Sequence, residues 1–304
     1  VRAMSRVRPT PRVYLSVMSF NIDGFVSSRG AEHQWANRVD LVLETLRRHQ
    51  ADVIVCQEAQ PGNCRSLQAC LSQYEQFRGL ATVDRESSDL ATYNLVVWRR
   101  EKFKCLETGS FYLSKTPEVW SKDWDSIAVR GATWVVLRSR EILEEVLVLN
   151  THLDNVGRQA RQESSKLIIE QVDGVCGRRQ CPVIVMGDFN SRAWAPPDES
   201  GTDYTAPVIP EALPPAGDVH AIYMEHGFKD SYEEAGYENV LDMNTYHDYC
   251  GPRFPPVALR IDWILYRASG HDLTLRSFRM IRDHHAGRFP SDHYPIAAKF
   301  AIRG

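Results

Sequence analysis

The chain has 304 residues, a hydrophobic fraction of 43% and a formal net charge of −3. This length allows one large α/β domain or two small ones, with a substantial core. The acidic balance argues against broad nucleic-acid binding through phosphate contacts, because proteins that bind in this way are usually basic. No apolar run reaches 18 residues, so no membrane-spanning helix is expected.

The first half of the chain alternates between predicted strands and a predicted helix. The basic segment 1–12 is expected to form a tail ahead of the domain. A helix is expected over 35–49, because apolar residues recur there at i, i+3 and i+4 spacing. Short apolar runs predict five strands, over 14–20, 53–56, 95–98, 133–137 and 146–149.

The second half continues the alternation and adds a long loop. We expect a helix over 158–172 and a shorter one that Asp218 caps and Gly227 closes. The proline-rich segment 195–217 has little periodicity and is predicted to be a loop insertion. The motifs on its two sides belong together, so we predict a single domain over 13–304. Four further strands are expected, over 183–186, 261–266, 273–280 and 296–302.

The seven cysteines predict neither a zinc site nor a complete disulfide framework. Their number is odd and they include no C-x-x-C spacing. The pairs Cys64/Cys70 and Cys176/Cys181 are close enough in sequence for a bridge where geometry allows one. The chain has no N-x-S/T sequon, and its start lacks the apolar region of a signal peptide. These features favour an intracellular location.

Polar side chains follow directly after apolar strands in six separate segments. A rigid strand fixes the position of the residue that follows it. One such Asp is more often a turn former than a catalyst, but six segments together predict a shared phosphate site. The residues concerned are Asn21 and Asp23, Glu58, His152 and Asp154, Asp188 and Asn190, Asp262, and Asp292 and His293.

These segments resemble the endonuclease/exonuclease/phosphatase (DNase I-like) superfamily, in that family's order. The matching motifs are SFNIDG at 19–24, CQEA at 56–59, NTHLD at 150–154, MGDFN at 186–190, RIDW at 260–263 and SDHYPI at 291–296. The resemblance implies an α/β fold, a four-layer sandwich of two mixed β-sheets flanked by helices, with the site at one end. Within the superfamily the chain is most similar to an uncharacterised branch. Its THL segment at 151–153 looks more like deadenylases, sphingomyelinases and phosphatases than abasic-site endonucleases.

Hydrolysis of a phosphate ester needs a cation, a positioned water and stabilisation of the developing charge. Glu58 and Asp292 are hard oxygen ligands suited to Mg²⁺ or Mn²⁺. Asn21 and Asp23 are predicted to complete or orient this metal set. Asn21 and Arg130 are also predicted to contact the substrate phosphate.

The remaining site residues are assigned to the water and the phosphate oxygens. Asp188 is predicted to align or deprotonate the attacking water. Asn190 and His152 are predicted to donate to the non-bridging oxygens. Asp262 is predicted to orient His293, which binds the phosphate or acts as an acid or base.

Two other features each have two possible interpretations. Asp154 is either functional or the side-chain cap of a turn before the helix that begins at Arg158. Five aromatic residues form either a rim that stacks bases or part of the core. They are Trp120, Trp124, Trp194, Tyr249 and Phe254.

The sequence therefore predicts a Mg²⁺- or Mn²⁺-dependent phosphoesterase that hydrolyses phosphodiesters by in-line attack of water. The expected substrate is a nucleotide or a single-stranded nucleic acid, and no protein partner is predicted. One alternative is a phosphomonoesterase or a lipid-headgroup (phosphoinositide or sphingomyelin) phosphoesterase. Another is a catalytically idle binding module, although none of the positions expected to bind metal or activate water is lost.

Overall fold

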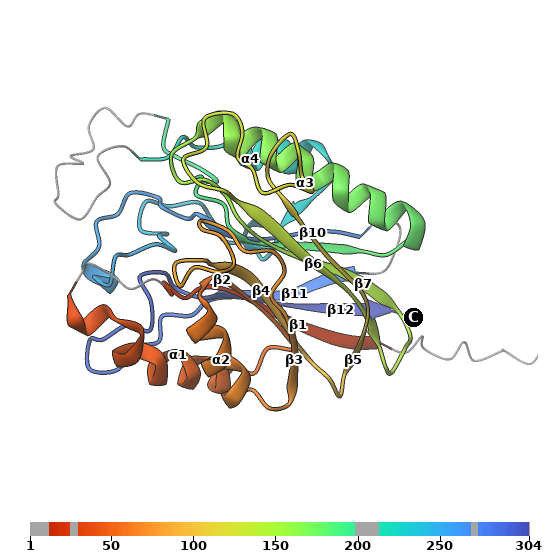
Figure 1. Ribbon diagram of the computed structural model, residues 1–304, viewed down its shortest axis with the longest axis horizontal. Helices are drawn as coiled ribbons and strands as arrows, with labels where there is room; N and C mark the ends of the chain where they lie inside the picture. Colours follow the sequence, from red (N-terminus) through yellow and green to blue (C-terminus); the bar gives the residue numbers. More distant parts are fainter. Residues whose placement is uncertain (1–11, 25–29, 198–212, 269–272, 304) are drawn as a thin grey trace, which may run out of the picture.

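The strands of this protein form two six-stranded sheets that pack face to face (Figure 1). A computed structural model describes residues 12–24, 30–197, 213–268 and 273–303. The first sheet has the order β11-β12-β1-β2-β4-β3. Its strands are β1 (Arg12–Asn21), β2 (Val53–Ala59), β3 (Tyr74–Phe77), β4 (Tyr93–Arg99), β11 (Leu273–Met280) and β12 (Ile296–Arg303).

The second sheet has the order β5-β6-β7-β8-β10-β9. β1 pairs in parallel with β2 and β7 with β8, while the other pairs are antiparallel, so both sheets are mixed. The strands of this sheet are β5 (Phe103–Tyr112), β6 (Gly131–Ser139), β7 (Glu145–His152), β8 (Val183–Asp188), β9 (Lys229–Asp230) and β10 (Asp262–Arg267).

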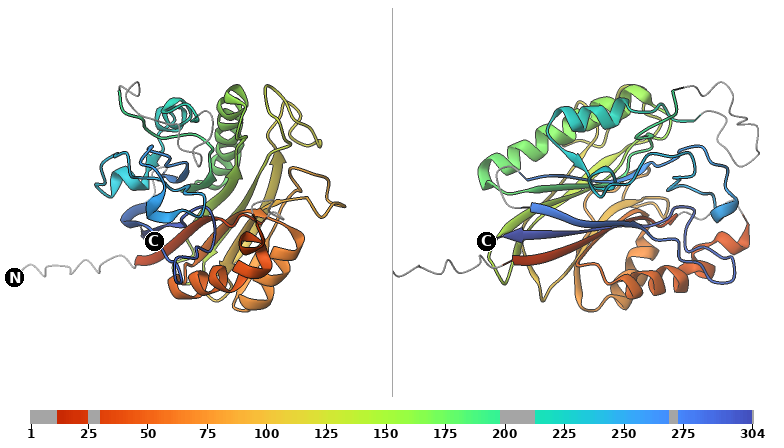
Figure 2. Two further views of the ribbon diagram at one scale, coloured as in Figure 1. Left: turned by 90° about the vertical axis from the view of Figure 1, so that its left-hand side faces the viewer. Right: turned by 180° about the vertical axis from the view of Figure 1, so that it is seen from behind.

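Helices cover the outer faces of the two sheets and complete four layers. Figure 2 shows α1 (Trp35–His49) and α2 (Pro61–Cys70) on the first sheet, and α3 (Arg158–Arg179) and α4 (Asp218–Glu225) on the second. The short helices α5 (Ser231–Glu234), η1 (Ala31–His33) and η2 (Gly251–Arg253) lie in connections. The predicted four-layer α/β sandwich is confirmed. No helix in the described part of the chain combines the length and apolar character that crossing a membrane requires.

Side chains alternate between the layers along each central strand. In β1, Leu15 and Val17 pack between the sheets, while Met18 and Phe20 pack toward α1 and α2. This period of two is the ordinary geometry of a strand that is buried on both faces. It explains why the predicted strands read as continuous apolar runs.

A buried polar link joins the two sheets just below the ends of their strands. Gln57 donates from Nε2 to Asn150 Oδ1 at 2.6 Å. Asn150 donates from Nδ2 to the carbonyls of Cys56 at 3.0 Å and Leu95 at 2.9 Å. Asn150 therefore fixes β7 against β2 and β4, and with it the strand ends that carry the polar residues.

Several predicted details differ from the structure. α2, β3 and β5 were not expected, and α3 extends to Arg179 rather than ending at 172. Asp218 does not cap α4. The cap is Gly217, with φ of 80°, and Asp218 is the first helical residue, where its carboxylate accepts from Arg158 at 2.8 Å. Residue 12 of the expected tail pairs with Arg303 in the first sheet.

Two further predictions concern the loop insertion and the cysteines. Most of the predicted loop, 198–212, lies outside the described residues, as does segment 1–11. All seven cysteines are free thiols in the described chain. Cys176 and Cys181 come close, with their sulfur atoms 3.6 Å apart.

Candidate active site

The predicted site residues lie at one end of the sandwich, where four strands finish. Because β1 runs parallel to β2 and β7 runs parallel to β8, their carboxyl ends meet there. β10 and β12 are antiparallel to neighbouring strands, so they begin at the same end. This topology explains why polar residues from distant segments converge.

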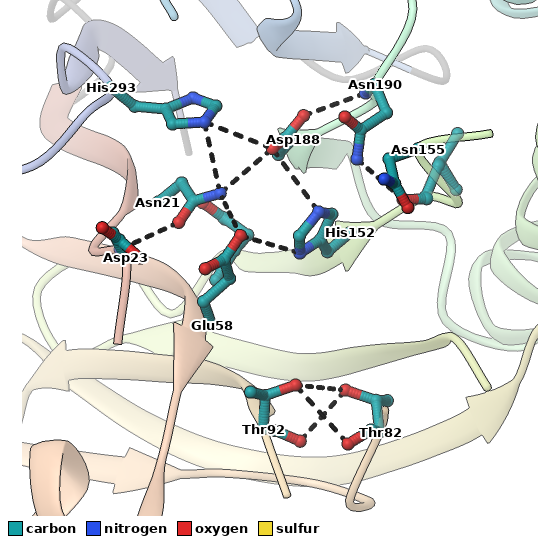
Figure 3. Close-up of polar contacts among 12 residues, drawn as sticks. Asn21, Asp23, Glu58, Thr82, Thr92, His152, Asn155, Asp188, Asn190 and His293 are labelled. Atoms are coloured by element: carbon teal, nitrogen blue, oxygen red, sulfur yellow. Dashed lines mark hydrogen bonds and ion pairs between the residues drawn. The ribbon is translucent and has the colours of Figure 1, made fainter. Parts of the chain in front are cut away.

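Asn21 lies at the centre of the cluster (Figure 3). Its Nδ2 donates to Glu58 Oε1 and to Asp188 Oδ2, each at 3.0 Å, and lies 3.5 Å from His293 Nε2. Its Oδ1 accepts from the Asp23 N–H at 3.1 Å. One buried amide thus connects the Glu58 carboxylate of the first sheet with the Asp188 carboxylate of the second.

Glu58 reaches the cluster through an irregularity in β2. The register between β2 and β4 shifts between Cys56 and Ala59, and Glu58 has a φ of 60°. Such a bulge redirects a side chain, and it is common next to active sites. Burial, together with the negative charges of Asp292 and Asp23, raises the pKa of Glu58 to about 8.

The crowding of Glu58, Asp292 and Asp23 matches the donor set of a divalent cation. Buried carboxylates that repel one another are costly unless a cation lies between them. Their oxygens are the ligands that hard divalent metals prefer. At the same site, Asp188, Asp262 and His293 have ligand atoms that all lie within 4.8 Å of one another. The site therefore contains a cluster of acidic groups and a histidine that fits a metal ion.

Asp23 is held by Arg38, which the sequence did not point to, and by Tyr249, which was expected only as part of an aromatic rim or of the core. Its carboxylate accepts from the Tyr249 hydroxyl at 2.6 Å and lies 3.9 Å from the Arg38 guanidinium. The buried Arg38 also donates to the carbonyls of Ile22 at 3.0 Å and Pro290 at 2.7 Å. These contacts turn the Asp23 carboxylate toward Tyr249 and fix the turn after β1.

His293 and Asp262 form a buried pair. His293 Nδ1 lies 2.8 Å from Asp262 Oδ2, and its Nε2 lies 3.7 Å from Asp188 Oδ2. Burial lowers the pKa of His293, but the charges of Asp262, Asp188 and Asp292 outweigh burial and raise this pKa well above its usual value. The geometry therefore favours a protonated imidazole at neutral pH.

Asp188 accepts hydrogen bonds on both carboxylate oxygens. Oδ2 accepts from Asn21, and Oδ1 accepts from the Asn190 N–H at 2.9 Å. Burial and the neighbouring Asp262 raise the pKa of Asp188 to about 6, while His293 and these hydrogen bonds oppose the rise. With a pKa of about 6, this carboxyl group is largely ionised at neutral pH.

His152 and Asn190 lie beside Asp188 on the second sheet. His152 Nε2 is 3.5 Å from Asp188 Oδ2, and its Nδ1 is 4.0 Å from Glu58 Oε1. Burial and the charges of Arg130 and His293 lower the pKa of His152 well below its usual value, so the ring is neutral. Asn190 has a φ of 46° and donates from Nδ2 to the Leu153 carbonyl at 2.9 Å.

Arg130 brings a buried positive charge to the site. It donates to Asn155 Oδ1 at 2.9 Å, and its Nε lies 3.6 Å from Asp154 Oδ2 without a hydrogen bond. Asp154 accepts from backbone N–H groups on both of its oxygens, including Gly157 at 2.8 Å and Ile127 at 3.1 Å. This pattern favours the capping interpretation of Asp154.

The cluster opens into a cleft of about 470 Å³. None of the five aromatic residues considered for a base-stacking rim lines this cleft. Tyr249 and Phe254 are buried in small apolar clusters instead. The predicted site residues among the polar lining are Glu58, Arg130, His152, Asp188, Asn190, Asp292 and His293.

Comparisons with known proteins agree with this architecture. A family model described as Endonuclease/Exonuclease/phosphatase family matches residues 18–293. No curated protein sequence matches the chain significantly. A similar solved structure is an endonuclease/exonuclease/phosphatase family protein from Bacteroides thetaiotaomicron. It is 24% identical, has a TM-score of 0.79, and the match covers 96% of each chain.

Two further structures share the fold at low identity. A mannosyl-6-phosphatase from Bacteroides thetaiotaomicron is 24% identical with a TM-score of 0.76, and the match covers 94% of this chain and 99% of that one. TDP2 from D. rerio, complexed with a single-strand DNA product, is 18% identical with a TM-score of 0.69. The match covers 94% of this chain and 98% of that one.

Proposed function

The chain belongs to the endonuclease/exonuclease/phosphatase family, and from that membership we propose that it is a divalent-metal-dependent phosphoesterase. Members of this family are phosphoesterases and nucleases. The observation that carries the proposal is the Asn21 amide, which lies 3.0 Å from both Glu58 and Asp188 and 3.5 Å from His293. It joins a candidate metal ligand, a candidate base and a candidate phosphate-binding group.

Glu58 and Asp292 would hold the metal, with Asn21 beside them and Asp23 in support. Mg²⁺ or Mn²⁺ suits these oxygen ligands and, when bound, neutralises charge on the phosphate. Asn21 also keeps the Glu58 carboxylate in place by its hydrogen bond. Tyr249 and Arg38 stabilise the turn that carries Asn21 and Asp23.

Asp188 would align the attacking water and take its proton. Its two oxygens are oriented by Asn21 and the Asn190 N–H, and a pKa of about 6 leaves it largely ionised at neutral pH. His293, kept protonated by Asp262, would donate to a phosphate oxygen on which charge develops. His152, Asn190 and Arg130 line the same cleft and would bind the other oxygens.

A phosphodiester is the first candidate substrate, as the sequence motifs predict, with a nucleotide or nucleic acid as the expected class. The likeness in fold to TDP2, which was crystallised with a single-strand DNA product, is compatible with it. Arg130 favours phosphomonoesters as a second candidate, because a buried guanidinium beside the cleft would neutralise the extra charge of a dianion. The likeness to a mannosyl-6-phosphatase points the same way.

The test is hydrolysis of bis-p-nitrophenyl phosphate and p-nitrophenyl phosphate with Mg²⁺ or Mn²⁺ by the wild type and by Asp188→Asn. We expect metal-dependent release of p-nitrophenol from at least one compound. Asp188→Asn should be slower by ~10²–10⁴-fold, as for the loss of a general base. No hydrolysis of either ester, with the protein folded and the metal present, would refute the proposal.

A further inference from the structure

The cleft has an aliphatic part that the proposed chemistry does not use. Beside the carboxylates and histidines it is lined by Val83, Ile127, Pro214, Leu259 and Ile261. These residues come from four connections, namely β3 to β4, β5 to β6, β8 to α4 and α5 to β10. Leu259 and Ile261 also belong to a buried apolar cluster that borders the cleft. Four separate parts of the chain thus line the space next to the proposed phosphate-binding residues with aliphatic residues.

Ile127 is the most exposed of these residues, with 54% of its surface accessible. Its backbone is nevertheless fixed by the buried Asp154 carboxylate. Asp154 Oδ2 accepts from the N–H groups of Ile127 at 3.1 Å and Ala128 at 3.3 Å, and from the Ser126 hydroxyl at 2.9 Å. A single exposed aliphatic side chain is ordinary on a protein surface. One held rigidly at the mouth of a catalytic cleft is placed to contact a ligand.

Val83 is held at the cleft in a strained conformation. Its φ is 66°, which is a rare value for a β-branched residue. Thr82 O accepts from the Asp84 N–H at 2.7 Å across this residue, and the Val83 N–H donates to Val129 O at 2.9 Å. Such strain persists only where the surroundings impose it, and it concentrates at ligand-binding sites.

The cleft offers little for stacking a nucleic-acid base. Tyr246 is the only Phe, Tyr or Trp among the described residues that line it. Its ring packs edge-on against His293 and Phe254, with centroid distances of 5.1 and 5.6 Å. Proteins that bind single strands stack bases on aromatic faces. An aliphatic lining instead favours a hydrocarbon group, whose affinity grows with the apolar area that it buries.

We propose that Val83, Ile127, Pro214, Leu259 and Ile261 form an aliphatic subsite for the hydrocarbon part of an amphiphilic phosphate ester. The polar cluster holds the phosphate, and the alkyl group next to it enters the subsite. This inference rests on the proposed phosphoesterase function. Among phosphate esters it favours those with an alkyl group close to the phosphate over the nucleotide that the sequence motifs predict.

The test is calorimetric binding of methyl-, butyl- and hexylphosphonate in the presence of Mg²⁺, below the concentrations at which they aggregate. Alkylphosphonates carry a P–C bond that the enzyme cannot hydrolyse, so binding is measured without turnover. The variants are Ile127→Ser and, as a matched control, Leu143→Ser. Leu143 is 68% exposed in the turn between β6 and β7, at the end of β7 away from the site. Both changes are at exposed positions and should leave the fold intact.

We expect affinity to increase by about two- to fourfold for each CH₂ group that enters the subsite. This dependence on chain length should persist in Leu143→Ser and flatten in Ile127→Ser, while methylphosphonate binds all three proteins equally. Equal binding of methyl- and hexylphosphonate by the wild type would overturn the subsite and leave the phosphate site intact. An unchanged slope in Ile127→Ser would overturn its assignment to these residues. No binding even of methylphosphonate would overturn the subsite as well, while the proposed function stands or falls separately by hydrolysis of the two p-nitrophenyl esters.

Discussion

Replacing Asp262 by Asn tests the pairing that keeps His293 protonated. Asp262 Oδ2 lies 2.8 Å from His293 Nδ1, and both groups are buried. Asn keeps a hydrogen-bond acceptor of the same size but removes the charge. A hydrogen bond to a charged group contributes about 1.5–3 kcal/mol, so its weakening corresponds to a loss of about 10- to 100-fold in kcat at pH 8.

The pH profile of Asp262→Asn should move as a whole toward lower pH. Asp262 raises the pKa of His293. Without the charge of Asp262 this pKa falls, so the imidazole loses its proton at a lower pH than in the wild type. Asp262 also raises the pKa of Asp188. In Asp262→Asn the pKa of Asp188 falls too, so this carboxylate stays ionised down to a lower pH than in the wild type. Both limbs of a bell-shaped profile therefore shift in the same direction.

The assay is kcat between pH 5 and 9, with NMR titration of His293 as an independent readout. Asp230→Asn is the matched control, because Asp230 is a buried carboxylate that lies 3.0 Å from His220 Nε2 but does not line the cleft. It should lower stability without moving the kcat profile. An Asp262→Asn profile that superimposes on the wild type, with unchanged His293 titration, would refute the reasoning.

Three further predictions follow from contacts in and near the site. Asn190→Ala removes a hydrogen-bond donor to the phosphate oxygen on which charge develops. It should lower kcat by ~10²–10³-fold without changing the shape of the pH profile. A shifted profile would mean that Asn190 acts through Asp188. Asn150→Leu removes the hydrogen-bond partner of the Cys56 and Leu95 carbonyls and of the Gln57 amide. Denaturant unfolding should therefore show a free energy of unfolding that is lower by about 3 kcal/mol or more. An unchanged free energy of unfolding would show that this link contributes little. The charge of Arg260 and the His220 hydrogen bond outweigh burial and lower the pKa of Asp230 to about 2 from the usual 3.8, which corresponds to about 2 kcal/mol. This stability is present above pH 4 and is lost as the pH falls toward 2, so the acid limb of the unfolding curve should be shallower in Asp230→Asn.

The central strands and the polar residues after them could be predicted because both signals are local. Apolar runs such as 183–186 are buried on both faces, so they read as strands without any knowledge of their partners. Asp188 follows such a run, and the parallel pairing of β7 with β8 places it beside His152. The family motifs then identify which strand ends share one site.

The elements that were missed have weaker local signals. β5 is half exposed along its middle and has a bulge between Cys105 and Glu107, so it contains no continuous apolar run. α2 has only ten residues and includes Gly62. Its start depends on a reciprocal cap between Gln60 and Asn63, rather than on an amphipathic pattern.

The contact of Tyr249 with Asp23 could not be predicted from the sequence, because it is purely tertiary. The two residues are 226 positions apart. Tyr249 lies in an irregular connection where Asp248 and Tyr249 both have positive φ, at 44° and 59°. Membership of a family motif does not by itself place a residue in the site. Asn150 belongs to the NTHLD motif, but its side chain links the two sheets and does not line the cleft.

The most direct test of the account is a metal titration of phosphoesterase activity in the wild type, Glu58→Gln and Asp188→Asn after treatment with EDTA. We expect no activity without metal and recovery with Mg²⁺ or Mn²⁺. Glu58→Gln should need more metal for half-maximal activity, because it removes a charged ligand. Asp188→Asn should reach half-maximal activity at the wild-type metal concentration but with a kcat lower by ~10²–10⁴-fold. Full turnover in EDTA, or identical metal dependence and kcat in the two variants, would contradict the separation of metal binding from water activation.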